Sequence, residues 1–415
     1  MTFRFITVPL KKSKSRNEKS DANFNKVPLS VKKSIEEKGR LCVSKFEMIS
    51  KALEKGSKYK DTLWKSVEGR EKMVKDIIDT VNLYESELAN LLFEYPVFAT
   101  GYYYCWESFL VDNGNIFYDD FRYDLQCMYF NVAAMLMNIT EYLLCWQMTP
   151  SNASMLEKES YRLLLQAAGY FRLLQEMAHD VKTYSVGITE LKRPDDIEVD
   201  FLEFFRLLAL TQAQEIGAAK AIEKQISGGK SMVVRLSHQV LILYKEALGI
   251  AQNHITSSKN EFLDILTFVQ LKADVFEALT FSHAASAVFD NSPSEGLWFA
   301  SQSDFFAKIV VNHRDQARTK KRTIPFSGED LIQNCCDIVQ KNCERITRIN
   351  SLVHRVKPKE GPLALPPAYE LAQMKQVQLP AKFPHQLTQP PAHLPPAEGG
   401  NQALDYAHML SWISI

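Results

Sequence analysis

Apolar residues recur at helical spacing along most of the chain between residues 120 and 290. In residues 154–180, one stripe of the expected helix collects Tyr161, Leu164, Ala168, Phe171 and Leu174, which is the spacing of an amphipathic helix. The whole pattern predicts serial helices near residues 121–147, 154–180, 199–226, 231–254 and 260–289, separated by stretches rich in helix breakers. Long helices with short loops stack as antiparallel hairpins, so we expect a mostly α solenoid, although no sequence repeat of about 34 residues is present.

The first part of the chain adds two helices and a small sheet to this prediction. Residues 3–10 alternate and are rich in β-formers, which predicts a short edge strand, and the polar residues 11–25 predict a loop. Helices are expected from about residue 31 and over residues 63–92. Residues 93–118 are rich in aromatic side chains and contain a DNGN turn signal, so we expect a hairpin there that pairs with the first strand.

The chain changes character beyond residue 290. The breakers of residues 291–296 are expected to end the helical array, and two more helices are expected near residues 300–317 and 328–354. Ten of the 17 prolines lie beyond residue 357. We therefore divide the chain into a helical domain, residues 1–357, and an extended proline-rich tail, residues 358–415, part of which straps along the helices.

The helix expected over residues 201–225 has two apolar sides. One side is a ridge of small residues at a spacing of four, formed by Ala209, Ala213, Gly217 and Ala221, which lets neighbouring backbones approach closely. The other side is a strip set among polar residues, formed by Phe201, Phe204, Leu208 and Ile222. Two interpretations stay open: the helix is buried on both sides, or the strip is a surface patch that docks a partner's helix.

Composition narrows the classes of function. Lys plus Arg equals Asp plus Glu at 49 each, which argues against a nucleic-acid-binding protein. The seven cysteines show no metal-ligand pairing, so we expect reduced thiols in a cytoplasmic protein. No apolar stretch approaches the roughly 18 residues that a membrane span requires.

The sequence carries no catalytic, metal-binding or cofactor-binding constellation. Residues 227–231 (SGGKS) resemble the end of a phosphate loop, but Lys224 replaces the first glycine of that motif and the stretch follows a helix, so a helix–helix turn is expected. The nine histidines form no metal-ligand spacing, and no nucleophile elbow or dinucleotide signature appears. We expect no enzyme activity, no cofactor and no metal. An unrecognised helical hydrolase is the alternative from another class of protein.

One candidate binding feature is basic. Residues 313–322 (HRDQARTKKR) form a charged run, and Lys11, Lys12, Lys14 and Arg16 lie near the start of the chain. This set is either a solvated charge cluster or a contact for anionic lipid headgroups.

A second candidate binding feature lies in the tail. Pro366, Pro367 and Tyr369 complete a PPxY motif, which is the ligand of WW domains because their aromatic groove accepts a polyproline II turn. A four-residue match also arises by chance in a proline-rich tail, so a WW-domain partner and a chance match both remain open.

Six stretches together resemble the Bro1 domain family, in the order in which that family carries them. They are residues 8–12 (VPLKK), 104–107 (YCWE), 129–134 (YFNVAA), 167–171 (AAGYF), 210–215 (LTQAQE, close to the family's LAQAQE signature) and 350–358 (NSLVHRVKP). Each motif is weak by itself, whereas six in the correct order are fairly specific. The resemblance covers about residues 3–365.

The resemblance implies a curved α-solenoid with tetratricopeptide-like helical hairpins and a small N-terminal β-sheet. It also implies a non-enzymatic adaptor in endosomal sorting or membrane remodelling, which binds the C-terminal helix of a CHMP4/Snf7-type ESCRT-III subunit through an apolar patch. On the LAQAQE-like helix, the residues that fit this patch are Phe201, Phe204, Leu207 and Leu208. A cytoplasmic protein recruited peripherally to endosomal membranes is therefore expected. The alternative is a divergent scaffold of the same fold with another protein partner.

The sequence departs from the family in three places. Val353 and His354 stand where the closing segment of the family carries a tyrosine, so phosphotyrosine signalling is not carried over. Ala218 and Ala219, after Gly217, stand where the family often has bulkier residues, which alters the expected patch. Short family members end in a prenylated CaaX box, whereas this chain ends SWISI, so no prenylation is expected.

Overall fold

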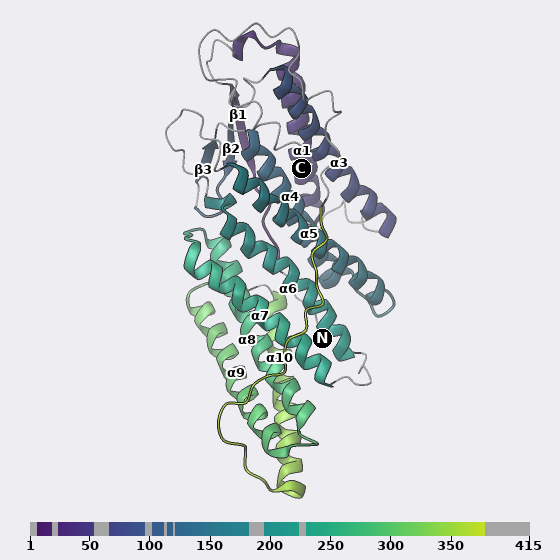
Figure 1. Cartoon of the computed structure of the whole chain (residues 1–415), viewed down its shortest axis with the longest axis vertical. Coiled ribbons are helices and arrows are strands. Elements are labelled where there is room, and N and C mark those ends of the chain that lie inside the picture. Colours follow the sequence, from purple (N-terminus) through teal and green to yellow (C-terminus); the bar gives the residue numbers. More distant parts are fainter. Residues whose placement is uncertain are drawn as a thin grey trace.

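The computed structural model describes residues 6–18, 24–53, 66–95, 102–111, 114–118, 121–181, 195–223, 230–324 and 326–377. In these ranges the chain is an elongated stack of helices with a small sheet near one end (Figure 1). Consecutive helices from α4 to α9 pack against each other, which confirms the predicted mostly α solenoid of helical hairpins. The helices are α1 (Leu29–Leu53), α3 (Val67–Glu94), α4 (Phe121–Tyr142), α5 (Ala153–Val181), α6 (Val199–Glu223), α7 (Lys230–His254), α8 (Asn260–Val288), α9 (Pro293–Thr319) and α10 (Phe326–Ile349).

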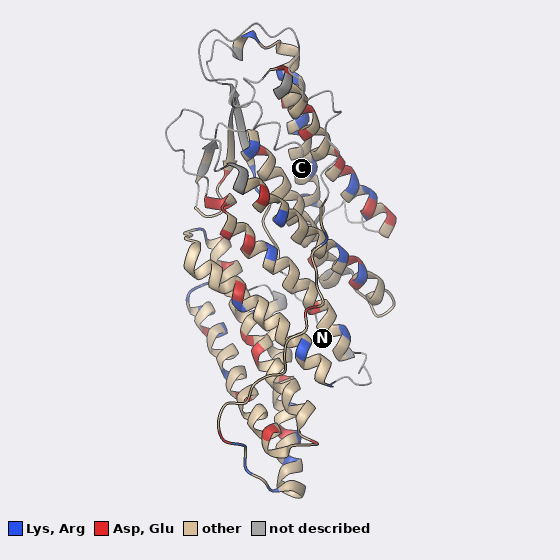
Figure 2. Ribbon diagram, in the orientation of Figure 1, with Lys and Arg blue, Asp and Glu red and all other residues tan. Residues whose placement is uncertain are grey.

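The ends of several helices differ from the prediction for local reasons. The break expected at residues 291–296 is present between α8 and α9 but ends earlier, at residue 292. Pro293 stands in the first turn of α9, where its fixed φ and missing N–H are tolerated. Two single π-turns extend helices, η3 (Leu143–Gln147) after α4 and η5 (Asn350–His354) after α10. Charged residues lie along the whole stack, with both signs mixed (Figure 2), as expected from the balanced composition.

The sheet is antiparallel, with strand order β1-β2-β3. The predicted hairpin is confirmed, since β2 (Tyr102–Glu107) pairs with β3 (Asn115–Tyr118). The predicted strand at residues 3–10 is wrong in position. The strand that pairs with β2 is β1 (Ser13–Glu18), within the stretch expected to be a loop.

Residues 6–12 are extended but pair with side chains instead of with a strand. Asn138 accepts from the N–H of Val8 and donates to its C=O, both over 2.8 Å. Asn131 does the same for Lys11, over 2.6 and 2.9 Å. Ile6 and Val8 are buried, as the alternation predicted. The buried main chain of this segment therefore finds its partners on α4, which an alternation pattern cannot indicate.

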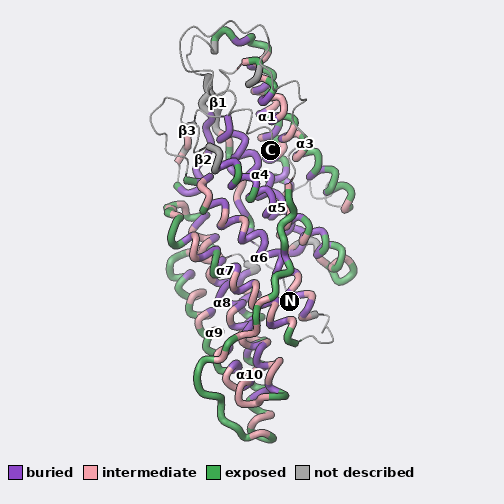
Figure 3. Tube along the Cα trace, in the orientation of Figure 1, coloured by how far each residue is buried: buried purple, intermediate pink, exposed green. Residues whose placement is uncertain are grey.

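Both apolar sides of α6 are buried. Phe201, Phe204, Leu207 and Leu208 are 1%, 0%, 4% and 0% exposed. The Phe201 ring packs 5.5 Å from that of Phe109, and the Phe204 ring lies 5.6 Å from that of Phe262. The expectation that these residues form an exposed patch is wrong, because α5 and α7 pack against α6 and the first turn of α8 adds Phe262. Figure 3 shows the purple, buried course of this helix.

The polar residues of α6 that follow these aromatics are also buried, and each has a partner. Gln212 accepts from the N–H of Ile6 over 2.6 Å. Both carboxylate oxygens of Glu215 accept from Lys272 Nζ of α8 over 2.8 Å, and Tyr244 of α7 donates its hydroxyl to Glu215. Burial raises the pKa of Glu215 and lowers the pKa of Lys272. The ion pair compensates this desolvation, so each partner depends on the other.

Replacement of Lys272 by Met is expected to reduce the free energy of unfolding by about 3–5 kcal/mol, because it leaves Glu215 buried without its cation. Urea unfolding at pH 7 measures this loss. Lys245→Met is the matched control, since Lys245 pairs with Glu277 at the surface over 2.6 Å and exposed pairs contribute about 1 kcal/mol or less. Equal effects of the two substitutions would contradict the assigned role of Lys272.

His283 of α8 predicts a component of stability that depends on pH. Burial lowers its pKa from 6.5 to about 4, and its Nε2 has no hydrogen-bond partner. Between these two pH values the unfolded chain takes up a proton that the folded chain does not, so stability falls as pH falls from 6.5 to 4. Relative to the His283→Gln variant, the free energy of unfolding of the wild type should fall by about 2 kcal/mol between pH 6.5 and pH 4, as measured by urea unfolding. A difference between the two proteins that stays constant with pH would refute this.

Candidate functional site

Residues 358–377 form an extended segment, here called the strap, which runs back along the helices after η5. Figure 1 shows it as the yellow trace across α7, α6 and α5, and Figure 3 shows it largely exposed above buried helices. The expectation that part of the tail straps along the helices is confirmed for these residues. Residues 378–415 lie outside the described part of the chain.

The first helix that holds the strap is α7. His238 Nδ1 lies 2.8 Å from the carbonyl oxygen of Pro366, and Arg235 Nε donates to the carbonyl of Pro367 over 3.1 Å. The N–H of Tyr369 donates to the carbonyl of Arg235 over 3.1 Å, and the Arg235 guanidinium lies 5.3 Å from the centre of the Tyr369 ring. Proline has no N–H, so its carbonyl is its one main-chain hydrogen-bonding group. Side chains of α7 bind the carbonyls of both prolines.

The second contact is with Gln214 of α6, whose side-chain amide binds the strap as a neighbouring strand would. Its Oε1 accepts from the N–H groups of Leu371 and Ala372 over 2.8 and 3.0 Å. Its Nε2 donates to the carbonyl of Tyr369 over 2.8 Å. One buried side chain of the LTQAQE stretch thus satisfies three main-chain groups of the strap.

The third contact is with α5, near the end of the described strap. The Tyr161 hydroxyl donates to the carbonyl of Leu371 over 3.0 Å, and the N–H of Lys375 donates to the carbonyl of Leu165 over 3.1 Å. Burial raises the pKa of Tyr161, so its hydroxyl keeps the proton that it donates at neutral pH.

Two glycines allow this close approach. A Cβ on Gly169 of α5 would lie 2.1 Å from the carbonyl oxygen of Lys375, and a Cβ on Gly217 of α6 would lie 2.4 Å from Cδ2 of Leu371. Both distances are far below van der Waals contact. A larger residue at Gly169 therefore conflicts with the backbone of the strap, and one at Gly217 conflicts with the Leu371 side chain.

The strap presents three apolar side chains to solvent above α6 and α5. Tyr369, Leu371 and Met374 are 42%, 41% and 42% exposed, whereas Ala372 between them is 1% exposed. We call these three residues the strap strip. Neighbouring exposed apolar side chains on a well-anchored segment are a typical protein interaction site. The strap strip is therefore the candidate functional site.

The predicted WW-domain ligand lies within this anchored segment. Pro366 is half-buried, and Pro367 and Tyr369 are exposed, but the carbonyls of all three are hydrogen-bonded to α6 or α7. The Tyr369 ring lies on Arg235. Binding to a WW domain stays a prediction, and it requires that the strap first leave α7.

The predicted basic run at residues 313–322 is mostly neutralised by ion pairs. Arg318 pairs with Glu329 over 2.8 Å, and Arg314 pairs with Asp315 over 2.9 Å. Lys11, also part of the predicted set, is buried and paired with Asp196. Lys12 is exposed, and the side chains of Lys14 and Arg16 lie outside the described set. The described part of the set is therefore not one free cationic surface.

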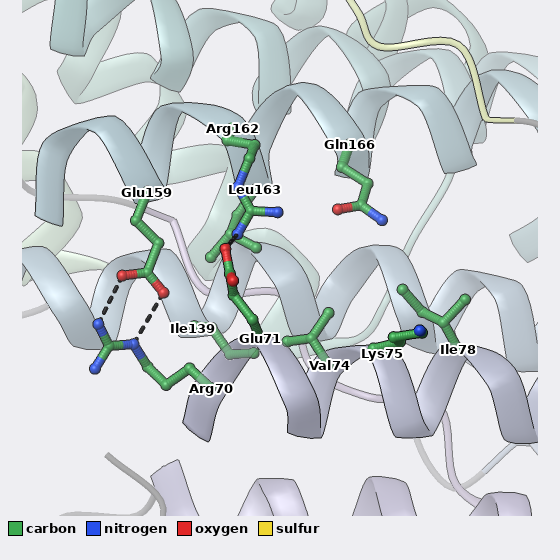
Figure 4. Close-up of a pocket in the computed structure, with 10 residues that line it drawn as sticks. All are labelled: Arg70, Glu71, Val74, Lys75, Ile78, Ile139, Glu159, Arg162, Leu163 and Gln166. Atoms are coloured by element: carbon green, nitrogen blue, oxygen red, sulfur yellow. Dashed lines mark hydrogen bonds and ion pairs between the residues drawn. The ribbon is translucent and has the colours of Figure 1, made fainter. Parts of the chain in front are cut away.

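A cavity of about 230 Å³ lies between α3 and α5. Figure 4 shows that its charged side chains are paired: Arg70 forms two bonds with Glu159, over 2.9 and 2.6 Å, and Arg162 binds Glu71 over 2.8 Å. Its remaining lining is aliphatic or amide in character, apart from Lys75. It is smaller than typical ligand pockets of about 300–1,000 Å³, and no Ser, Thr, Cys or His side chain lines it.

The described residues contain neither a metal site nor a membrane-spanning helix. No group of three His, Cys, Asp or Glu side chains lies close enough together there to hold a metal ion. None of the helices described is both long and apolar enough to cross a membrane.

Leu371 and Met374 of the strap strip were not predicted from the sequence, and Tyr369 was predicted only as part of the PPxY motif, because their exposure depends on long-range packing. The available signals were weak: Gly169 and Gly217, each inside a predicted helix, and the amide of Gln214 on a buried face. A glycine in a helix interior indicates close approach of another chain segment, but it does not identify which one.

Comparisons with known proteins give one family and several solved structures. A family model described as "BRO1-like domain" matches residues 25–392. No curated protein sequence matches the chain. A structure of the ALIX BRO1 domain in complex with CHMP4C matches with a TM-score of 0.61 at 15% identity, covering 92% of this chain and 97% of the other.

Two other structures give similar scores. ALIX in complex with the SIVmac239 PYKEVTEDL late domain matches with a TM-score of 0.60 at 15% identity, covering 92% of this chain and 50% of that one. A structure on endosomal targeting by the Bro1 domain matches with a TM-score of 0.57 at 14% identity, covering 90% and 93%. At these identities the likeness concerns the fold.

Replacement of Gly169 by Ala is expected to loosen the strap, because the new methyl group would collide with the backbone of Lys375. Limited trypsin digestion should then cleave after Lys375 at least about fivefold faster, since local opening controls access to the protease. Gly249→Ala in α7 is the matched control, because its Cβ would meet nothing within 4 Å. Equal cleavage rates in all three proteins would mean that Gly169 does not hold the strap in place.

Proposed function

The chain belongs to the BRO1-like domain family, and from this we propose that it is an ESCRT-associated adaptor that binds the C-terminal helix of a CHMP4/Snf7-type subunit. Such a helix is amphipathic, with an apolar face of large side chains. The proposal also includes peripheral recruitment of the protein to endosomal membranes through this partner. The likeness to the ALIX BRO1–CHMP4C complex supports it at the level of the fold.

The observation that carries the proposal is the strap strip. Tyr369, Leu371 and Met374 lie exposed beside α6, the helix of the LTQAQE stretch. A partner helix that buries its apolar face here would be stabilised by about 25 cal/mol per Å² of apolar surface removed from water, less the cost of ordering the partner. The surrounding helices are rigidly packed, so the site requires little reorganisation of this chain.

This site replaces the patch expected from the sequence. Phe201, Phe204, Leu207 and Leu208 lie in the core and offer no surface to a partner. Leu371 packs directly on Gly217, next to the alanines that stand where the family often has larger residues. In this chain the strap therefore supplies an apolar side chain at a position where the helix itself has none.

A scaffold with a different protein partner is the second candidate function. It is favoured by the same contact, because the strap covers part of α6 that would otherwise be accessible. The two functions differ in one outcome: the adaptor binds a CHMP4-type helix in at least one form, with or without the strap, and the scaffold binds it in neither form. No enzymatic function is proposed, because the BRO1-like family is a family of protein-interaction domains.

Leu371→Asp is expected to weaken binding of a fluorescent CHMP4-type C-terminal helix peptide by about tenfold or more, because a charge would replace the central apolar side chain of the strip. Fluorescence anisotropy with the full chain measures this change. Leu83→Asp is the matched control, since Leu83 is 55% exposed on α3, and it should leave affinity unchanged. Saturable binding that survives Leu371→Asp would exclude the strap strip as the site.

A chain that ends at Lys357 shows whether the strap forms the site of the adaptor or covers it. If the strap strip forms the site, this truncation abolishes peptide binding. If the strap covers the site, the truncation strengthens binding. Absence of binding by the wild type and by the truncated, folded chain would favour the scaffold with another partner.

A further inference from the structure

The chain turns from the last helix into the strap through an exposed apolar end, residues 350–357, here called the tip. η5 contains no buried residue. Leu352 and Val353 are 66% and 68% exposed, the highest values among the large hydrophobic side chains of the described residues, and Val356 is 39% exposed. The tip lies at the lower end of the stack in Figure 1. These apolar side chains are thus presented at one extremity of the molecule.

The tip is held in one conformation by its own hydrogen bonds. The Asn350 side chain donates to the carbonyl of Val356 over 3.0 Å and accepts from its N–H over 3.1 Å. Arg355 adopts a left-handed conformation, with φ 54°, and its N–H donates to the carbonyl of Asn350 over 2.6 Å. The His354 ring packs edge-on against Phe289, with centroids 5.5 Å apart. The exposure of Leu352 and Val353 is therefore built into the turn and is not the fraying of a helix end.

Cations surround these apolar side chains. Residues 344–360 contain five Arg and Lys residues and two Glu residues, although the whole chain has zero net formal charge. Arg348, Arg355 and Lys357 are exposed and have no carboxylate partner among the described residues. Figure 2 shows blue segments where the chain passes from the last helix into the strap. The basic run at residues 313–322 differs, because carboxylates already neutralise most of its arginines.

We propose that the tip docks on an anionic lipid surface. Leu352 and Val353 would enter the boundary between headgroups and acyl chains, while Arg348, Arg355 and Lys357 contact lipid phosphates. The tip is the lower end of the stack (Figure 1), and its exposed apolar side chains among cations match a lipid surface, which is anionic at the headgroups and apolar below them. This inference does not depend on the proposed binding of an ESCRT-III helix.

The test is cosedimentation of the purified full chain with vesicles of phosphatidylcholine alone or with 30% phosphatidylserine. The wild type should bind the anionic vesicles, and binding should weaken with added salt. Leu352→Asp combined with Val353→Asp should lower the partition coefficient at least about tenfold. Arg348→Ala combined with Lys357→Ala should lower it about 25-fold, since each basic residue contributes about fivefold near such a surface.

Two matched controls separate the tip from general surface effects. Leu83→Asp removes an exposed leucine of α3, and Lys33→Ala combined with Lys51→Ala removes two exposed cations of α1; both should bind as the wild type does. Equal binding to neutral vesicles, or equal loss in the controls, would overturn the proposal. So would a tip variant that keeps vesicle binding but changes the oligomeric state in gel filtration, because the tip would then be a contact between copies of the chain.

Discussion

Polar side chains buried in the middle of α6 impose the constraint on which the rest of the fold depends. A buried polar side chain without a hydrogen-bond partner destabilises the folded state. The cost is about 1–3 kcal/mol for a neutral amide and more for a charged carboxylate. Gln212 finds its partner in Ile6, 206 positions away, and Gln214 finds its partner in Ala372, 158 positions away. Glu215 is bound by Lys272 and Tyr244 from the two following helices. One helix therefore brings the beginning of the chain, its strap and its central hairpins together, and the LTQAQE stretch is recognisable because each of its polar residues has a separate structural task.

The helices could be predicted from the sequence because helical periodicity is a local property. The stretches between residues 121 and 289 follow the expected helices within a few residues. The two apolar sides of α6 were also evident, but a helical wheel shows which side chains are apolar and not what covers them. The covering comes from the neighbouring helices α5 and α7 and from Phe262 of α8, and their packing depends on three-dimensional arrangement that a wheel does not contain. The first strand was misplaced for the same reason, because the alternation of Ile6 and Val8 reports burial, while the hydrogen bonds that would define a strand come from asparagines of α4.

The strap strip could not have been predicted from the sequence, because only one of its three residues, Tyr369, belongs to a recognisable motif. Tyr369 entered the sequence analysis as part of a short linear motif, and the neighbouring prolines indicated an extended segment. This segment crosses α6 because three conditions are met. The Gln214 side-chain amide binds the main chain of the strap, Gly217 and Gly169 leave space for it, and α7 provides donors for the proline carbonyls. None is visible as a pattern. The resemblance to a family indicated the correct family and fold, but the side chains that it assigned to an exposed patch are buried.

The strap also changes the mechanics of the whole stack. In a linear array of helical hairpins each unit contacts mainly its neighbours, so such an array can unravel stepwise from one end. Here one continuous segment is bonded to Ser294 at the start of α9, to Arg235 of α7, to Gln214 of α6 and to Leu165 of α5. Loss of the terminal helices cannot proceed without breaking contacts on helices several units away. The strap therefore couples helices that do not contact each other directly, so the stack is expected to unfold as one cooperative unit. A pulling force applied at the C-terminal side would have to detach the strap before the helices that it crosses could separate.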